Sequence, residues 1–313
     1  MLKSTTYKVL IKLTKIKNSK IFAQFKNLHY NDTKNLRAGV VEKIIKERLD
    51  GIEQRYGVRI LYACESGSRA WNFASKDSDY DVRFVYVRPL SWYLGISDKR
   101  DVIEEPILDE FDINGWDLQK FLKLAFKSNV VVFEWLKSPI IYRKSELWDE
   151  ISTLCFEYFS VKASLYHYLN MAERNYRLYL APPHIKLKKF FYVLRPLLFF
   201  FYIQTHQKPS PMDFLELLDF ARAKNFISAQ IDEQIQILYA MKIQSTELTK
   251  TNQSTLAQTD GNALKQDILL KWINQNFDKC KGLMKNLTAN TPKRDIAPLD
   301  KACYNIIYKL ENV

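Results

Sequence analysis

The feature that most constrains the fold is a short turn followed by a pair of aspartates, each joined to a strand-like run. An apolar run leads into Gly67 and Ser68, and Asp79 and Asp81 head a second such run twelve residues later. Because side chains alternate faces along a strand, the two aspartates point to one side, roughly 7 Å apart along its axis. Carboxylates placed in this way can share divalent cations about 3.5–4 Å apart, the geometry of in-line phosphoryl displacement. The pattern predicts a triphosphate on the turn and two metal ions on the aspartates.

The turn itself suits an anion. Gly67 allows close backbone approach, and Ser68 supplies a hydroxyl and an N–H group. Arg69 completes the predicted phosphate-binding set. An acidic cluster can also serve only to solubilise a turn, but that alternative fits poorly because Asp81 heads an apolar strand on which Arg83 shares its face. Whether Arg83 pairs with a carboxylate or contacts the triphosphate stays open.

A third carboxylate is expected on a neighbouring strand, flanked by apolar residues. Asp112 fits this pattern, and we predict that it binds one metal ion and orients or deprotonates the attacking hydroxyl. Asp117 fits as well, but it precedes a helical pattern and would serve there as an N-cap. Asp109 and Glu110 are weaker candidates. The choice between Asp112 and Asp117 stays open.

The amino-acid composition indicates which binding partners and which compartment to expect. The 313-residue chain has 47 Lys and Arg against 35 Asp and Glu, a net charge of +12 that favours polyanions such as RNA. Its four cysteines are scattered without metal-ligand spacing, which predicts a reduced, cytoplasmic protein. Since no apolar run reaches the roughly 18 residues needed to cross a bilayer, we expect no membrane partner.

The sequence pattern divides the chain into three segments. Residues 1–35 form a basic arm, open to interpretation as an RNA-contacting segment or as a frayed extension. Residues 36–146 alternate helical and strand patterns, whereas residues 147–313 are nearly free of Gly and read as helices. The fold class is therefore an α/β (α+β) domain with a small mixed sheet, followed by an all-helical domain.

Periodicity places the elements of both domains. Strands are predicted at 58–64, 80–87, 101–105 and 110–113, with a turn at Asn114-Gly115. Helices are predicted at 39–56, 69–73, 118–127, 130–136, 148–179, 185–206, 211–226, 229–243, 263–286 and 298–311. Residues 244–261 are polar and are expected to form a mobile loop.

Longer strings point to a known family. The turn and paired aspartates resemble the signature of the DNA polymerase beta-like nucleotidyltransferase superfamily. The strings at 67–83, 115–120, 128–139 and 188–196 are similar to a bacterial and phage family of nucleotidyltransferases linked by name to RNA repair. The resemblance extends over about residues 40–220, and more loosely to the end of the chain. It implies a nucleotidyltransferase domain, two divalent metal ions (usually Mg²⁺, with Mn²⁺ as a substitute) and a nucleoside triphosphate such as ATP.

The helical part offers further nucleotide contacts. Lys188, Tyr192 and Arg195 lie at helical spacing on one face, which would suit a triphosphate and a stacked base across a cleft. The alternative is a cationic edge on an otherwise buried helix, with Tyr192 in the core. Lys186 or Lys189 would substitute for Lys188. Glu134 is expected to be a buried glutamate that orients a loop.

The sequence thus predicts an enzyme that moves a nucleoside monophosphate from a triphosphate to an acceptor hydroxyl, with RNA as the favoured acceptor, and releases pyrophosphate. Two alternatives stay open. One is a nucleotide- or RNA-binding regulatory module, such as half of a toxin–antitoxin or defence pair. The other is transfer to a protein or a small molecule. The oligomeric state and the choice of base are not predicted.

Overall fold

The computed structural model describes residues 39–75, 77–107, 110–181, 187–244, 264–285 and 294–311. The chain divides into two units, residues 1–51 and residues 52–313. The predicted helix over 39–56 is present. All the sheet strands, and the site described below, belong to the second unit. The basic arm and the polar loop predicted at 244–261 lie outside the described residues, apart from Gln244 at the end of a helix.

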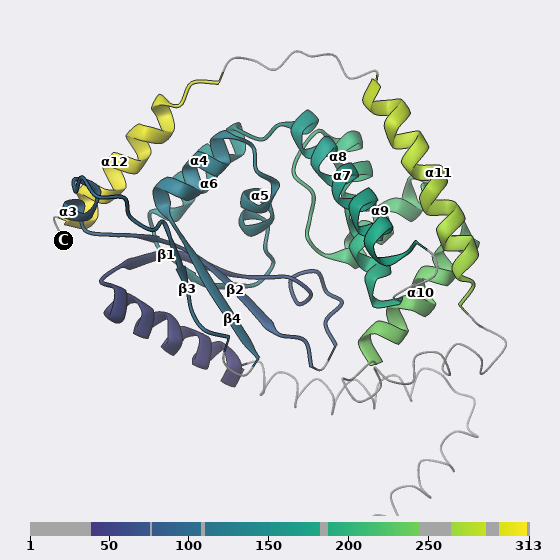
Figure 1. Cartoon of the computed structure of the whole chain (residues 1–313), viewed down its shortest axis with the longest axis horizontal. Helices are drawn as coiled ribbons and strands as arrows, with labels where there is room; N and C mark the ends of the chain where they lie inside the picture. Colours follow the sequence, from purple (N-terminus) through teal and green to yellow (C-terminus); the bar gives the residue numbers. More distant parts are fainter. Residues whose placement is uncertain are drawn as a thin grey trace, which may run out of the picture. The chain divides into compact units, whose positions relative to one another are not determined.

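A five-stranded mixed sheet forms the centre of the first half of the chain (Figure 1). Its strands are β1 (Arg59–Ser66), β2 (Tyr80–Val87), β3 (Val102–Glu104), β4 (Phe111–Asp117) and β5 (Ile141–Lys144), in the order β3-β4-β2-β1-β5. Among the neighbouring strands of this sheet, only the β2–β4 pair is parallel. This pairing sets the starts of β2 and β4 beside the end of β1, so the segments that carry the predicted site meet at one edge of the sheet.

Five of the described helices pack against the sheet and share one apolar core with it. They are α3 (Leu90–Tyr93), α4 (Leu118–Phe126), α5 (Val130–Leu136), α6 (Trp148–Glu157) and α12 (Ala297–Glu311). Leu299 and Ile306 of α12 join the same buried cluster as Leu61 of β1 and Phe121 of α4. The last helix of the chain therefore packs with the sheet domain, next to α4 and α6 (Figure 1).

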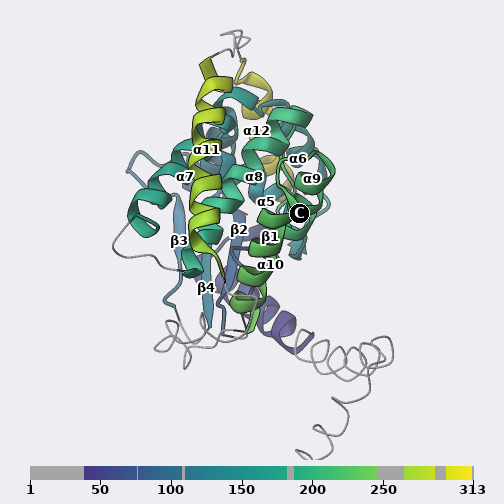
Figure 2. The ribbon, with the colours of Figure 1, turned by 90° about the vertical axis from the view of Figure 1, so that its right-hand side faces the viewer.

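The remaining helices enclose a second core. They are α7 (Val161–Tyr179), the 3₁₀ turn η1 (Leu187–Phe190), α8 (Phe191–His206), α9 (Phe214–Ala223), α10 (Ala229–Gln244) and α11 (Gln266–Lys285). Buried residues lie all around α8, because α7, α9 and α11 each pack against it. Figure 2 shows α11 running alongside α7 and α8. The predicted fold class, a mixed-sheet domain followed by helices, is confirmed, while the domain boundary at 146/147 stays a prediction.

Two local predictions are wrong. Asn114-Gly115 is not a turn, because β4 runs through it to Asp117; an added Cβ on Gly115 would lie 2.1 Å from the Phe84 ring, so this glycine serves a close approach between strands. Residues 67–72 form hydrogen-bonded turns instead of a helix, since Asn72 adopts a left-handed φ of 59°. The strand β5 was not predicted from the sequence.

Two findings bear on the compositional predictions. All four cysteines are buried free thiols. In the described parts of the chain, no helix combines the length and the apolar character that a membrane span requires.

Candidate active site

The Gly67 turn packs directly onto a carboxylate. Gly67 has a φ of 78°, a left-handed conformation that favours glycine, and an added Cβ would lie 2.1 Å from Asp81 Oδ2. Glycine is therefore required here twice, once for the backbone path and once for space. The turn closes through a hydrogen bond from the Trp71 N–H to the Gly67 carbonyl at 3.0 Å. The predicted turn and one predicted metal ligand, Asp81, are thus packed together.

Asp81 and Asp112 lie side by side on parallel strands. They are direct partners in the β2–β4 register, and Arg83 links them. Arg83 Nη2 is 2.7 Å from Asp112 Oδ2 and 3.4 Å from Asp81 Oδ1. The side chains of the two aspartates remain 28% and 24% exposed. Of the two alternatives for Arg83, the pairing with carboxylates is therefore present in this structure.

Burial and negative neighbours make this a place that favours a cation. The pKa of Asp81 is raised to about 6, mainly by burial and also by the nearby Asp112 and Asp79 carboxylates, while Arg83 opposes the rise. Asp79 itself lies just before β2 and is exposed. Both other predicted aspartates therefore lie close enough to Asp81 to act on its ionisation.

A buried glutamate beneath the turn was missed at the sequence level. Glu65 is fully buried at the end of β1, where its carboxylate accepts hydrogen bonds from the Asp81 N–H at 2.8 Å and from the Tyr142 hydroxyl. Burial raises its pKa to about 7, and these two hydrogen bonds oppose the rise. The signal was a lone acid ending an apolar strand just before the turn. Glu65 positions the backbone that carries Asp81.

The donor set fits a divalent metal that also takes ligands from a substrate. Among the described residues, no three His, Cys, Asp or Glu side chains converge into a complete metal site. Magnesium, however, is commonly held by one or two carboxylates together with waters and substrate phosphates. Asp81 and Asp112 supply such neighbouring oxygen donors, with Asp79 nearby. Arg83 forms ion pairs with both aspartates in this arrangement, and a metal ion would add the positive charge that one guanidinium does not supply.

Arg69 lies against the backbone around Asp79. Its guanidinium stacks 3.6 Å from the Tyr80 ring centroid, while Nε donates to the Asp79 carbonyl at 3.1 Å and Nη2 donates to the Ser78 carbonyl. These contacts hold the segment that delivers Asp79 to the site. A role in phosphate binding stays a prediction, as it does for the half-buried Ser68.

Of the predicted face on α8, two residues lie against the turn. Arg195 is buried, pairs with Glu134 at 3.1 Å and stacks 3.7 Å from the Trp71 ring centroid. Tyr192 is 40% exposed, meets Trp71 edge-on and carries Lys189 Nζ 4.2 Å above its ring. The side chain of Lys188 lies outside the described residues. Arg195 therefore pairs with an acid inside the protein. Its partner Glu134 is buried, as the sequence predicted. Tyr192, in contrast, is partly accessible to solvent.

Helices from the second half of the chain hold the turn in place. The Phe214 N–H donates to the Trp71 carbonyl at 3.0 Å, and the Tyr239 hydroxyl donates to the Asn72 carbonyl at 2.7 Å. Asn72 Nδ2 also donates to Asp213 Oδ2 at 3.0 Å. These partners are separated from the turn by some 140 to 170 residues, and no local pattern could have revealed them. The helical part fixes the geometry of the turn.

Asp117, the other candidate for the third carboxylate, lies at the far end of β4. It is 1% exposed, and its carboxylate accepts hydrogen bonds from the Gln119 N–H and the Tyr93 hydroxyl, both at 2.8 Å. It is the N-cap of α4. The structure places Asp112, and not Asp117, beside Asp81.

Comparisons with known proteins identify the family of the chain. The model of the RNA repair pathway DNA polymerase beta family, RlaP, matches residues 41–292. The chain belongs to this family. It is also 48% identical over 196 residues to the Bacillus subtilis (strain 168) protein named Uncharacterized protein YcgL, covering 62% of this chain and 75% of that protein. Membership in the family implies a polymerase beta-like nucleotidyltransferase.

Proposed function

We propose that the protein transfers a nucleoside monophosphate from a nucleoside triphosphate to a hydroxyl group of RNA and releases pyrophosphate. One observation carries the proposal: Asp81 and Asp112 are paired across parallel strands while Asp81 also packs under the glycine turn. An acid pair and an anion-binding turn in one place suit phosphoryl chemistry, in which positioning and charge neutralisation do most of the work.

The residues of the chain take distinct roles in this proposal. The Gly67-Ser68 backbone receives the phosphates, Asp112 orients the acceptor hydroxyl and accepts its proton, and the exposed ring of Tyr192 stacks on the base. Lys188 would add a positive charge for the triphosphate. Because Arg195 is paired with Glu134, its part in this proposal is to hold Trp71, and so the turn, in place.

Two Mg²⁺ ions, or Mn²⁺ as a substitute, would be held by Asp79, Asp81 and Asp112. When bound, such ions would neutralise the triphosphate and favour ionisation of the acceptor hydroxyl. The pKa of Asp81, raised to about 6, lies below neutral pH, so its carboxylate is ionised and able to bind a cation under those conditions.

Two facts support RNA as the acceptor. The family is named for an RNA repair pathway, and the net charge is +12. An RNA acceptor would be attracted by this net positive charge, and its binding should weaken steeply with salt.

The test is incubation of the purified protein with each α-labelled nucleoside triphosphate, Mg²⁺ and total cellular RNA. Transfer of label to RNA by the intact protein, and loss of that transfer in Asp79→Asn and Asp81→Asn, is the expected result. The control is thermal melting, which should show that both variants remain folded. Normal turnover by Asp79→Asn would overturn the mechanism.

Other outcomes separate the alternatives. Label in protein or in a small molecule, with RNA unlabelled, would reassign the acceptor while leaving the site chemistry intact. Binding of nucleotide without any turnover would favour a regulatory module, such as one component of a toxin–antitoxin or defence pair.

A further inference from the structure

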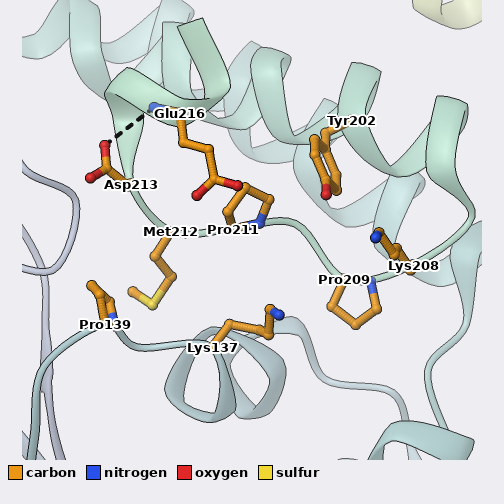
Figure 3. Close-up of a pocket in the computed structure, with 9 residues that line it drawn as sticks. All are labelled: Lys137, Pro139, Tyr202, Lys208, Pro209, Pro211, Met212, Asp213 and Glu216. Carbon is orange, nitrogen blue, oxygen red and sulfur yellow. Dashed lines mark hydrogen bonds between the residues drawn. The ribbon is translucent and has the colours of Figure 1, made fainter. Parts of the chain in front are cut away.

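A pocket of about 320 Å³ lies next to the turn, between the end of α5 and the segment that joins α8 to α9 (Figure 3). Its volume is near the lower end for small-molecule sites. Asp213 in its wall bonds to Asn72 of the turn, and Pro139 in its wall follows Ser138, whose hydroxyl donates to the Glu65 carbonyl. The pocket therefore borders both segments that shape the proposed active site, yet it includes none of the predicted site residues.

Some charged side chains of the pocket have no ion-pair partner within the described residues. In the described part of the chain, Lys137, Lys208 and Glu216 are exposed and have no ion-pair partner. Asp213, in contrast, is already engaged, because it caps α9 and bonds to Asn72. Figure 3 shows Glu216 across the pocket from Lys137. Two ammonium groups and one carboxylate are thus left to face a ligand.

The rest of the lining offers rings and a thioether. Pro139, Pro209 and Pro211 present saturated rings, Tyr202 presents an aromatic ring, and the buried Met212 adds a polarisable thioether. These groups can make apolar contact with the ring of a base. A ligand that matches the whole pocket would combine an anionic group for the lysines, a hydroxyl donor for the carboxylate and a flat ring for the apolar walls.

We propose that this pocket binds one ribonucleotide unit of the acceptor RNA, upstream of the reacting end. The phosphate lies on Lys137 and Lys208, the ribose 2′-hydroxyl donates to Glu216, and the base packs on the proline and methionine walls. This inference rests on the proposed function, because it supplies a binding site for the acceptor that function requires. It also explains how the protein would select RNA over DNA, since DNA lacks the hydroxyl that Glu216 accepts.

The test measures binding of a fluorescent single-stranded ribo-oligonucleotide and of the same sequence as DNA, by anisotropy, over a series of salt concentrations. The double variant Lys137→Ala, Lys208→Ala should weaken RNA binding about tenfold and lower the slope of log K against log salt by roughly 0.7 for one lost phosphate contact. The control variant Lys271→Ala removes an exposed lysine of α11 that does not line the pocket, and it should change affinity less than twofold.

Glu216→Leu tests the ribose contact separately. Leucine has a similar size but removes the hydrogen-bond acceptor together with the charge, so RNA affinity should fall several-fold relative to DNA affinity. An equal change for RNA and DNA would overturn the assignment of Glu216 to the ribose hydroxyl. If the double lysine variant binds RNA as tightly as the wild type does, the proposal that this pocket binds RNA is overturned.

Two further arms separate the possible failures. Binding and transfer are both measured on the wild type, so lysine-dependent RNA binding by a wild-type protein that transfers no label to RNA would support the pocket and overturn the proposed function. If the double lysine variant transfers nucleotide and binds RNA with unaltered affinity, the proposed function is supported and the pocket is overturned. Free adenosine monophosphate is tested by calorimetry: binding lost in the double variant, together with unaltered RNA affinity, would assign the pocket to a free nucleotide and overturn the RNA assignment.

Discussion

Asp112 and Asp117 stand near the two ends of the same seven-residue strand, β4, and their surroundings differ sharply. Asp112 shares Arg83 with Asp81 and accepts a hydrogen bond from the Asn114 side-chain amide, yet its side chain remains 24% exposed. Asp117 is 1% exposed, and each of its carboxylate oxygens accepts a hydrogen bond from within the protein. Both acids end apolar stretches of sequence, so their local patterns look alike.

The difference makes exposure, and not acidity alone, the property that distinguishes a candidate catalytic carboxylate. An ionised carboxylate offers about four lone-pair sites. At the Asp112 end, the partly exposed carboxylates of Asp81 and Asp112 keep lone pairs open to solvent although Arg83 and Asn114 donate to them. At the Asp117 end, the helix N-terminus and Tyr93 use the carboxylate for structure. The following substitutions test this contrast.

The largest effect is expected from exchanging the two acids for their amides. Asp112→Asn should lower turnover by at least about 1,000-fold, roughly 4 kcal/mol of transition-state stabilisation, because a charged ligand and proton acceptor is lost. Asp117→Asn should leave turnover within about threefold, since Asn is an equally good N-cap. Steady-state nucleotide transfer measures both. The opposite result would make Asp117 the third carboxylate of the site.

A methyl group on the turn should have the next largest effect. In Gly67→Ala the new Cβ would fall on Asp81 Oδ2, so the carboxylate must move and turnover should drop about 100-fold, close to 3 kcal/mol. The matched control is Gly57→Ala, which has a similar φ of 59° but open space around it. That control should lose about 1 kcal/mol of stability through strain alone and keep its turnover. Equal losses of turnover in the two variants would remove the argument from contact with Asp81.

Two tyrosine hydroxyls allow the ends of the sheet to be compared with the same chemical change. Tyr239→Phe removes the hydrogen bond to the Asn72 carbonyl, and turnover should fall about fivefold, near 1 kcal/mol, because the turn is held less firmly. Tyr93→Phe removes a donor from the buried Asp117, so the free energy of unfolding should fall by about 1–3 kcal/mol with turnover unchanged. Kinetics and urea unfolding are measured for both variants. A loss of turnover in Tyr93→Phe alone would contradict the division of roles.

The smallest effect is a pH dependence at the structural end. Burial raises the pKa of Asp117 above its ordinary value of 3.8, so the folded protein binds this proton more tightly than the unfolded chain does. The resulting stabilisation is fully present below pH 3.8 and is lost as pH rises through the raised pKa. The free energy of unfolding of the wild type, relative to Asp117→Asn, should therefore decrease with rising pH. Urea unfolding at a series of pH values measures both free energies of unfolding. If the wild type gains stability relative to Asp117→Asn as pH rises, the raised pKa of Asp117 is refuted.

The sequence alone predicted the parts of the fold that local pattern controls. The apolar run before Gly67 and the alternation after Asp79 each predicted a strand, and the helical period predicted most helices of the second half. The three aspartates were predicted from their spacing and apolar neighbours, and the structure places Asp81 and Asp112 together. Their catalytic role stays a prediction. Such patterns work because the side-chain period of 2 or 3.6 residues is set by the backbone itself.

Only the tertiary structure decided which distant surfaces cover these elements and which polar partners complete the site. The burial of Glu65 between Asp81 and Tyr142, the pairing of Arg195 with Glu134 and the return of α12 to the sheet all join residues far apart in the chain. A local pattern shows that a face is apolar or that a group can donate, but it does not name the partner. That choice depends on how the whole chain packs, because most buried polar groups find their partners only in the final arrangement.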